Sequence, residues 1–272
     1  MSGNWLPEQQ RRLDEFRASR CVDVHCHCLA GLDDGPASLE ESLALCELLA
    51  RDGITTVVAS PHQLGRYDRL NSASVVREAV AELSAALVSQ QIPLEIVPGG
   101  DVRIDERLPR LLESDEILTV ADTGYHLLLE LPHELFVDPL PTIDVLREHG
   151  LQPILTHPER HAYLHGTIDW ATDWTRHGAV LQITAGSLLG DFGGRAFEQA
   201  WRLVDAGLVS LIATDAHDTQ RRPPRMTAAL TALAERAGAD AARRLAIDNP
   251  VLVLNGQPIE LPCDPGPDGR AI

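Results

Sequence analysis

The sequence contains no lysine: all 23 of its basic residues are arginine, against 40 aspartate and glutamate residues. The resulting formal net charge of -17 repels a polyanionic duplex unless cations or a local basic patch intervene. Nucleic acid is therefore not expected as a partner. The missing lysine is interpreted mainly as genome bias, although arginine is also the better bidentate phosphate ligand.

Long apolar runs are absent as well. No stretch approaches the roughly 20 apolar residues of a membrane-spanning helix, and the first 20 residues mix charges without the apolar segment of a secretory signal. The five cysteines are an odd number without such a signal, which argues against a disulfide framework. We expect a soluble, cytoplasmic protein with reduced thiols and no membrane insertion.

Apolar runs alternate with segments of helical period along most of the 272 residues. Continuous Val, Ile and Leu runs are typical of parallel strands buried on both faces. Seven strand-helix units in about 250 residues predict an α/β fold. We expect a distorted TIM-like (β/α)7 barrel more than an open sheet, although periodicity does not decide whether the sheet closes into a barrel. The predicted strands are 21–25, 55–60, 94–98, 126–131, 153–156, 180–184 and 210–214, and the predicted helices are 38–52, 72–90, 141–149, 168–177, 194–206 and 224–237.

Three regions are expected. Residues 1–20 form an N-terminal extension with a short amphipathic helix over 7–17, residues 21–255 form the barrel, and residues 256–272, rich in proline, form a loosely packed tail. The first barrel helix should begin with a capping box at Ser38 to Glu41 and end at Gly53.

Ionisable side chains follow six of the seven predicted strands. Each one alone is explained equally well as a helix cap or a satisfied core group. Because the carboxyl ends of barrel strands converge on one face, however, their repetition predicts a shared site. The candidate metal ligands are His25, His27, His62, Asp101, Glu130, His157, Asp215 and His217.

His25 and His27 are two residues apart on an extended segment, so both imidazoles should point to one face and share a metal. Cys26 and Cys28 would then point away and pack as small hydrophobic residues; if they bound zinc instead, the histidines would be turned away. A mixture of imidazoles and carboxylates favours Mn, Fe or Zn over Ca or Mg.

Two further features lie beside these ligands. Asp33 and Asp34 precede a glycine and are most simply a turn, but either one also offers an oxygen ligand to the cluster. Arg160 and Arg222 follow strand ends closely, where a guanidinium group suits a phosphate dianion. The alternative for each arginine is a surface ion pair with one of the many carboxylates.

The ordered motifs VDVHCH (22–27), GLDDG (31–35), GITTVVASPH (53–62), THPER (156–160) and TDAH (214–217) together are specific. Over residues 21–250 the sequence resembles the PHP-type (polymerase and histidinol phosphatase) protein-tyrosine phosphatases of bacterial capsule and exopolysaccharide synthesis. The resemblance implies a distorted TIM-like barrel with a trinuclear metal site, often with manganese.

The resemblance also implies roles for individual residues. His25, His27, Asp101 and Asp215 would hold one ion, Asp101, Glu130 and His157 a second, and Asp34 (or Asp33), His62 and His217 a third. Arg160 and Arg222 correspond to phosphate-binding arginines. A protein-derived proton donor is optional for a phenolate leaving group with a pKa of about 10, and the candidate donor is His217 or a metal-bound water. The sequence departs from the family at Asp101, where glutamate is usual, and at Gln63, where a second histidine often follows His62.

The predicted activity is metal-dependent hydrolysis of phosphotyrosine in proteins, with a tyrosine kinase of polysaccharide export as the implied partner. We expect two or three divalent ions, Mn first and Fe or Zn as alternatives. None of the cysteines is followed by arginine at the CxxxxxR spacing of a phosphocysteine mechanism. The alternatives are a small-molecule phosphatase of the histidinol-phosphate type and a phosphotyrosine-binding regulator whose catalysis is weakened by Asp101.

Overall fold

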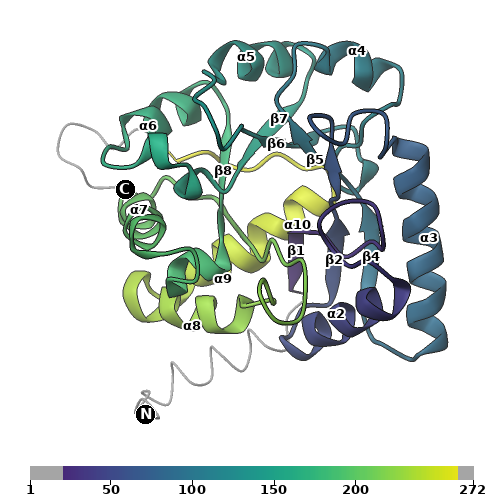
Figure 1. Ribbon diagram of the computed structural model, residues 1–272. Helices are drawn as coiled ribbons and strands as arrows, with labels where there is room; N and C mark the ends of the chain where they lie inside the picture. Colours follow the sequence, from purple (N-terminus) through teal and green to yellow (C-terminus); the bar gives the residue numbers. More distant parts are fainter. Residues whose placement is uncertain (1–20, 263–272) are drawn as a thin grey trace.

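In the computed structural model, residues 21–262 are described, so the predicted helix over 7–17 and the end of the tail lie outside the described residues. The strands form two parallel sheets that are surrounded by helices (Figure 1). The first sheet contains β1 (Val22–Cys26), β2 (Thr56–Ala59) and β4 (Glu95–Pro98). The second contains β3 (His62–Gln63), β5 (Asp101–Arg103), β6 (His126–Glu130), β7 (Gln152–Thr156), β8 (Val180–Thr184) and β9 (Leu211–Ala213).

The seven predicted strand positions are confirmed, but two of them continue across a break into the other sheet. β3 follows β2 after Pro61, which has no N–H for a ladder, and β5 follows β4 after Gly99 and Gly100. A Cβ on Gly99 would lie 2.5 Å from a methyl group of Val58, so the close approach requires glycine.

The end of the last strand, β9, is hydrogen-bonded to the first strand, β1. The backbone N–H of Asp215 donates to His25 O (2.8 Å), and that of His27 donates to Ala216 O (2.9 Å), which links the end of β9 to β1. These contacts and the strand order confirm the predicted distorted TIM-like arrangement, in which the carboxyl ends of all strands face one side.

The six predicted helices are present within two residues of their expected bounds. Ser38 caps the first of them by accepting from Glu41 N, but the Glu41 carboxylate accepts from Ala37 N instead of completing the capping box at Ser38. The predicted helices are α2 (Leu39–Arg51), α3 (Ala73–Ser89), α5 (Leu140–Glu148), α6 (Asp169–Arg176), α7 (Gly194–Asp205) and α8 (Met226–Ala237); those not predicted are α4 (Leu108–Glu113), α9 (Ala239–Arg243), the π-helix Arg244–Asp248 and α10 (Asn249–Leu254).

Two apolar cores hold the strands in place. The larger core lies between the strands and the outer helices, and a smaller one includes Val22 and Val24 of β1 together with Val253 of α10. The tail differs from the expectation of loose packing from residue 256, because Ile259 is buried in the smaller core and its N–H donates to Gln152 Oε1 (3.2 Å). Within the described residues no helix is both long and apolar enough to cross a bilayer.

An irregularity in β1 sets the orientation of the site residues. Between Asp23 and Cys26 the pairing with β2 shifts, as at a β-bulge. As a result Val24 packs in the smaller core, whereas Cys26 and Cys28 pack in the larger one, as predicted.

Candidate metal centre

All of the predicted ligands come together at the carboxyl ends of the strands. His25 lies near the end of β1 and His27 follows it, and Asp34 lies in the loop before α2. His62 begins β3, Asp101 begins β5 and Glu130 ends β6. His157 follows β7, and Asp215 and His217 follow β9.

The first ligand group surrounds the His25 and His27 ring nitrogens, whose Nε2 atoms are 3.1 Å apart. Asp215 Oδ1 lies 3.4 Å from each of these Nε2 atoms, and Asp101 Oδ2 lies 3.7 Å from that of His25. Two donors that are each about 2.1 Å from one transition-metal ion lie about 3.0–3.4 Å apart. The spacing therefore fits a shared ion.

Hydrogen bonds on the far side of both rings fix their orientation. His25 Nδ1 is 2.9 Å from Gln182 Oε1, and His27 Nδ1 is 2.6 Å from Asp33 Oδ2. In each ring Nδ1–H donates to an oxygen, so Nε2 is directed into the cluster.

The second ligand group contains Asp34, whose Oδ1 lies 3.4 Å from His62 Nε2 and 3.4 Å from His217 Nε2. His27 completes this group. The neighbouring Asp33 is already occupied, since its carboxylate accepts from His27, from Gly35 N (2.9 Å) and from His62 N (3.0 Å). The geometry therefore favours Asp34 as the ligand and Asp33 as the residue that orients His27.

The third ligand group joins Asp101, Glu130 and His62. Asp101 Oδ2 lies 3.2 Å from His62 Nδ1, and Glu130 Oε2 lies 3.6 Å from it. Asp101 thus reaches both this group and His25 despite its short side chain. His157 is not in this group: its ring centroid is 5.6 Å from the rings of His25 and His133.

His157 Nδ1 is buried and has no hydrogen-bond partner among the described residues, and Asp101 Oδ2 and His62 Nδ1 have only each other, as an ion pair without hydrogen-bond geometry. Such atoms cost about 1–3 kcal/mol each when they are left unpaired. A divalent cation would satisfy them, and the imidazole and carboxylate donors suit a first-row transition metal. The residues present therefore fit the metal ions that the resemblance implies.

In the metal-free cluster, the charges of neighbouring carboxylates and histidines shift one another's pKa values. Burial alone would lower the pKa of both His27 and His62, but the Asp33 carboxylate raises that of His27 to about 9, and Asp101 and Asp34 raise that of His62 to about 11. Burial and the Asp101 charge raise the pKa of Glu130 to about 7. A metal that binds here must displace these protons.

Two of the site residues have left-handed backbone conformations, His157 (φ 36°) directly after β7 and Asp215 (φ 51°) shortly after β9. Residues other than glycine adopt this region at a cost of about 1–3 kcal/mol, and they do so mostly at functional sites. Both residues follow strand ends at the cluster.

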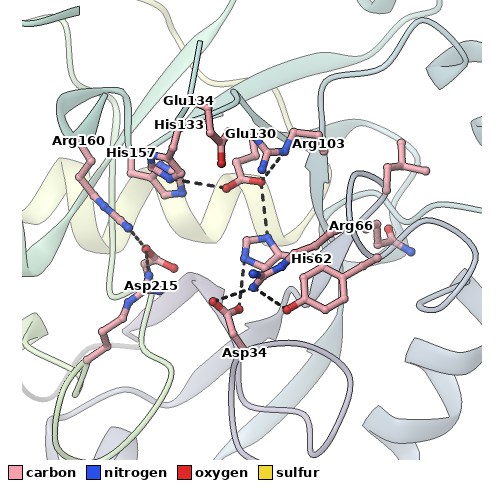
Figure 2. A pocket seen from close by; sticks show the side chains of 14 residues that line it. Asp34, His62, Arg66, Arg103, Glu130, His133, Glu134, His157, Arg160 and Asp215 are labelled. Atoms are coloured by element: carbon pink, nitrogen blue, oxygen red, sulfur yellow. Dashed lines mark hydrogen bonds and ion pairs between the residues drawn. The ribbon is translucent and has the colours of Figure 1, made fainter. Parts of the chain in front are cut away.

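A pocket of about 270 Å³ opens beside the ligands (Figure 2). Arg160 Nη1 and Arg222 Nη2 both pair with Asp215 Oδ2, so the two guanidinium groups meet at one point of its wall. The ring of Phe192 lies 4.3 Å from the guanidinium carbon of Arg160 and 5.9 Å from that of Arg222. The arrangement places two cations where a phosphate dianion would meet the metal ligands.

Sequence reasoning missed several pocket residues. Arg103, which lies 3.3 Å from Glu130 Oε2, could have been found, since it is two residues after Asp101 on the same strand. Tyr67 stacks on the His62 ring (centroids 5.6 Å apart), but it comes from a loop and had no periodic signal. The other missed residues are Arg66, His133 and Glu134.

Gln63, the second departure from the family pattern, does not take a ligand position. It is buried, its Nε2 donates to Asn71 O (2.7 Å), and its Oε1 accepts from Leu118 N (2.8 Å). Both ends of the amide are used to hold neighbouring loops together.

Comparison with known proteins agrees with this geometry. The chain is 32% identical over 246 residues to the tyrosine-protein phosphatase YwqE of Bacillus subtilis, covering 88% of this chain and 93% of YwqE. It is 28% identical to the tyrosine-protein phosphatase CpsB of Streptococcus pneumoniae, covering 87% of this chain and 99% of CpsB.

The fold agrees as well. A crystal structure from a study of YwqE and CpsB as unique metal-dependent tyrosine phosphatases superposes with a TM-score of 0.84 and 31% identity, covering 88% of this chain and 96% of the other. The family described as capsular polysaccharide synthesis, CpsB/CapC, matches residues 21–255. By its sequence, its fold and the residues gathered at its strand ends, the chain belongs to the CpsB/CapC family.

Proposed function

We propose that this chain is a metal-dependent phosphoesterase that removes phosphate from phosphotyrosine in proteins. The observation that carries the proposal is the convergence of Arg160 and Arg222 on the same pocket wall as the overlapping His and carboxylate groups. The relatives named as tyrosine phosphatases support the substrate class.

The proposed ligand sets follow the resemblance, with the geometry favouring Asp34 over Asp33. Two or three ions would be held, manganese first and iron or zinc as alternatives. When bound, such ions polarise phosphoryl oxygens, lower the pKa of water and stabilise the leaving oxygen. Asp101 reaches two of the ligand groups and would join them.

The arginines bind the phosphoryl group in this proposal. Their planar guanidinium groups form paired hydrogen bonds to its oxygens, and Phe192 beneath them limits their rotation. Cys26 and Cys28 take no part in this proposal, because both are buried in the outer core and burial raises the pKa of Cys26 to about 11.

His217 fits a ligand role better than the role of proton donor. Burial and the neighbouring His27 charge lower its pKa to about 4, so the ring is neutral at pH 7. Its Nδ1–H donates to Asp215 O (3.0 Å), so the lone pair is on Nε2, which accepts from Arg222 Nη1 (2.9 Å) and lies 3.4 Å from Asp34 Oδ1. A tyrosine leaving group, with a pKa of about 10, can take its proton from solvent.

The proposed partner is a tyrosine-phosphorylated protein of capsule or exopolysaccharide synthesis, and a tyrosine kinase of polysaccharide export is the specific candidate. The test compares kcat/KM of the manganese-loaded protein for a phosphotyrosine peptide and for histidinol phosphate, with and without chelator. We expect preference for the peptide and loss of activity with chelator. Preference for histidinol phosphate would establish the small-molecule alternative, and binding of the peptide without turnover would establish the regulator.

A further inference from the structure

Large apolar side chains are exposed on two loops beside the pocket. Among the described residues, eight large apolar side chains are exposed, and five of them lie on helices. The other three are Leu70 (61% exposed), Leu135 (57%) and Phe136 (52%). Leu70 lies in the 64–72 loop, between β3 and α3, and the other two lie in the 131–139 loop, between β6 and α5.

Both loops also form walls of the pocket. The lining residues that they supply are Leu64, Arg66, Tyr67, His133 and Glu134. Figure 2 shows His133 and Glu134 on one side of the pocket and Arg66 on the other. Leu135 directly follows Glu134, and Leu70 follows Tyr67 by three residues. The exposed side chains therefore lie at the rim of the pocket, on both of these sides.

Contacts within the protein restrain both loops. Phe136 packs edge-on against the Tyr163 ring, with centroids 5.6 Å apart, and the Tyr163 hydroxyl donates to Pro132 O (2.6 Å). At the end of the other loop, Asn71 Nδ2 donates to His62 O (2.9 Å). Apolar side chains on restrained loops favour binding, because little conformational freedom is lost when a partner covers them.

We propose that Leu70, Leu135 and Phe136 form a docking surface for apolar side chains that flank phosphotyrosine in the substrate; this rests on the proposed function. The pocket receives the phosphorylated side chain, so the backbone of a protein substrate has to cross the rim, over these two loops. Apolar side chains next to the tyrosine would then cover leucine and phenylalanine surface that is otherwise in water.

The test uses the full-length, manganese-loaded protein and measures binding and turnover separately. The binding probe is a peptide with a non-hydrolysable phosphonate analogue of phosphotyrosine, made either with leucine on both sides of the analogue or with serine there. We expect the leucine peptide to bind roughly 5- to 20-fold more tightly than the serine peptide. The combined variant Leu135→Ala/Phe136→Ala should lose most of this difference. Its kcat/KM for para-nitrophenyl phosphate should be unchanged, because that substrate has no flanking residues to reach the rim.

Phe197→Ala is the matched control. Phe197 is also exposed and also packs edge-on against an aromatic ring, that of Trp201, but it lies on α7 and does not line the pocket. It should keep the preference for the leucine peptide. Leu70→Ala tests the other loop, and it decides the outcome if the combined variant does not fold by circular dichroism.

Equal binding of the two peptides by the unmodified protein would overturn the docking surface. A matching loss of para-nitrophenyl phosphate turnover in the variants would also overturn it, since the pocket itself would then be damaged. A dimer that the combined variant abolishes in sedimentation would assign these side chains to a contact between two copies instead. Turnover of phosphotyrosine peptides without a preference for leucine would leave the proposed function intact, whereas the preference in binding without any turnover would support the docking surface and contradict the proposed function.

Discussion

At the scale of single residues, burial and a shared partner distinguish the two pocket arginines from surface ion pairs. Arg160 and Arg222 both contact Asp215, and the side chain of Asp215 is almost completely buried. Burial raises the pKa of Asp215, but Arg222, His25 and Arg160 outweigh it and hold the pKa well below its usual range. The arginines therefore lie against a permanent negative charge.

Replacing either arginine by alanine should lower kcat/KM for a phosphotyrosine peptide by roughly 30- to 1000-fold while the metal content is retained. The reason is a charge-assisted contact of about 2–4 kcal/mol that strengthens in the transition state. Lysine should restore only part of the loss, because it keeps the charge without the planar fork. Near-normal steady-state kinetics in both alanine variants would rule out the phosphate-binding role.

Phe192 should act on substrate binding through the arginines. Phe192→Leu removes the ring from beneath both guanidinium groups and should lower kcat/KM by about 3- to 30-fold, which corresponds to a cation–π contribution of roughly 0.5–2 kcal/mol. The loss should appear mainly in KM. Phe192→Tyr keeps the ring and is the control; an equal loss in both variants would indicate a packing role instead.

At the scale of elements, the strand starts and strand ends carry different polar groups. His126 begins β6 at the end remote from the metal ligands, is buried, and has Nε2 3.0 Å from Gln152 Oε1. Burial lowers its pKa from 6.5 to about 4, because the charged form would lose its hydration. It serves the fold and not the cluster.

This histidine makes stability depend on pH. Between pH 6.5 and pH 4 the unfolded chain takes up the proton and the folded chain does not, so the free energy of unfolding should fall as the pH falls. The full effect is about 3 kcal/mol for a shift of this size. The free energy of unfolding, measured with urea between pH 4 and 7.5, should depend less on pH in His126→Gln than in the unmodified protein. The other titrating groups are the same in both proteins, so their contributions cancel in the comparison. Identical pH profiles would contradict this assignment.

At the scale of the whole molecule, carboxylates dominate the metal-free state. The net charge is -17, and Asp34, Asp101, Glu130 and Asp215 all lie in or beside one pocket. Bound cations would relieve this repulsion and satisfy the unpaired nitrogens and oxygens.

Manganese should therefore raise the melting temperature. At 100 times the dissociation constant, one bound ion adds about 2.7 kcal/mol, which corresponds to roughly 5–11 °C for a chain of this size. Differential scanning calorimetry with manganese, and then with excess chelator, measures the gain and its reversal. His62→Ala lacks a ligand of two groups and should show a smaller gain; no shift in the unmodified protein would count against the metal centre.

Metal affinity should also rise with pH. The raised pKa values of His27 and His62 mean that the metal-free protein holds protons which binding must release. Calorimetric titration in buffers of different ionisation enthalpy should detect proton release at pH 7. Binding without proton release would show that these histidines remain outside the coordination sphere.

Much of the fold was predictable because it depends on local pattern. Buried parallel strands are apolar throughout, and the helices between them keep a helical period. The short helices α4, α9 and α10 were missed because five or six residues give too little periodicity to detect. The break between β2 and β3 was missed because it depends on how two sheets meet.

The sequence by itself determined which residues end the strands, and with them the candidate ligand types, the lack of a CxxxxxR motif and the family resemblance. These properties follow from residue order, since parallel strands bring their carboxyl ends to one face. Only the tertiary structure favours Asp34 over Asp33 as the ligand, gives Gln63 a packing role and brings His133 to His161, which are 28 positions apart along the chain. Each of these outcomes depends on distances between side chains from different loops, and residue spacing along the chain does not specify such distances.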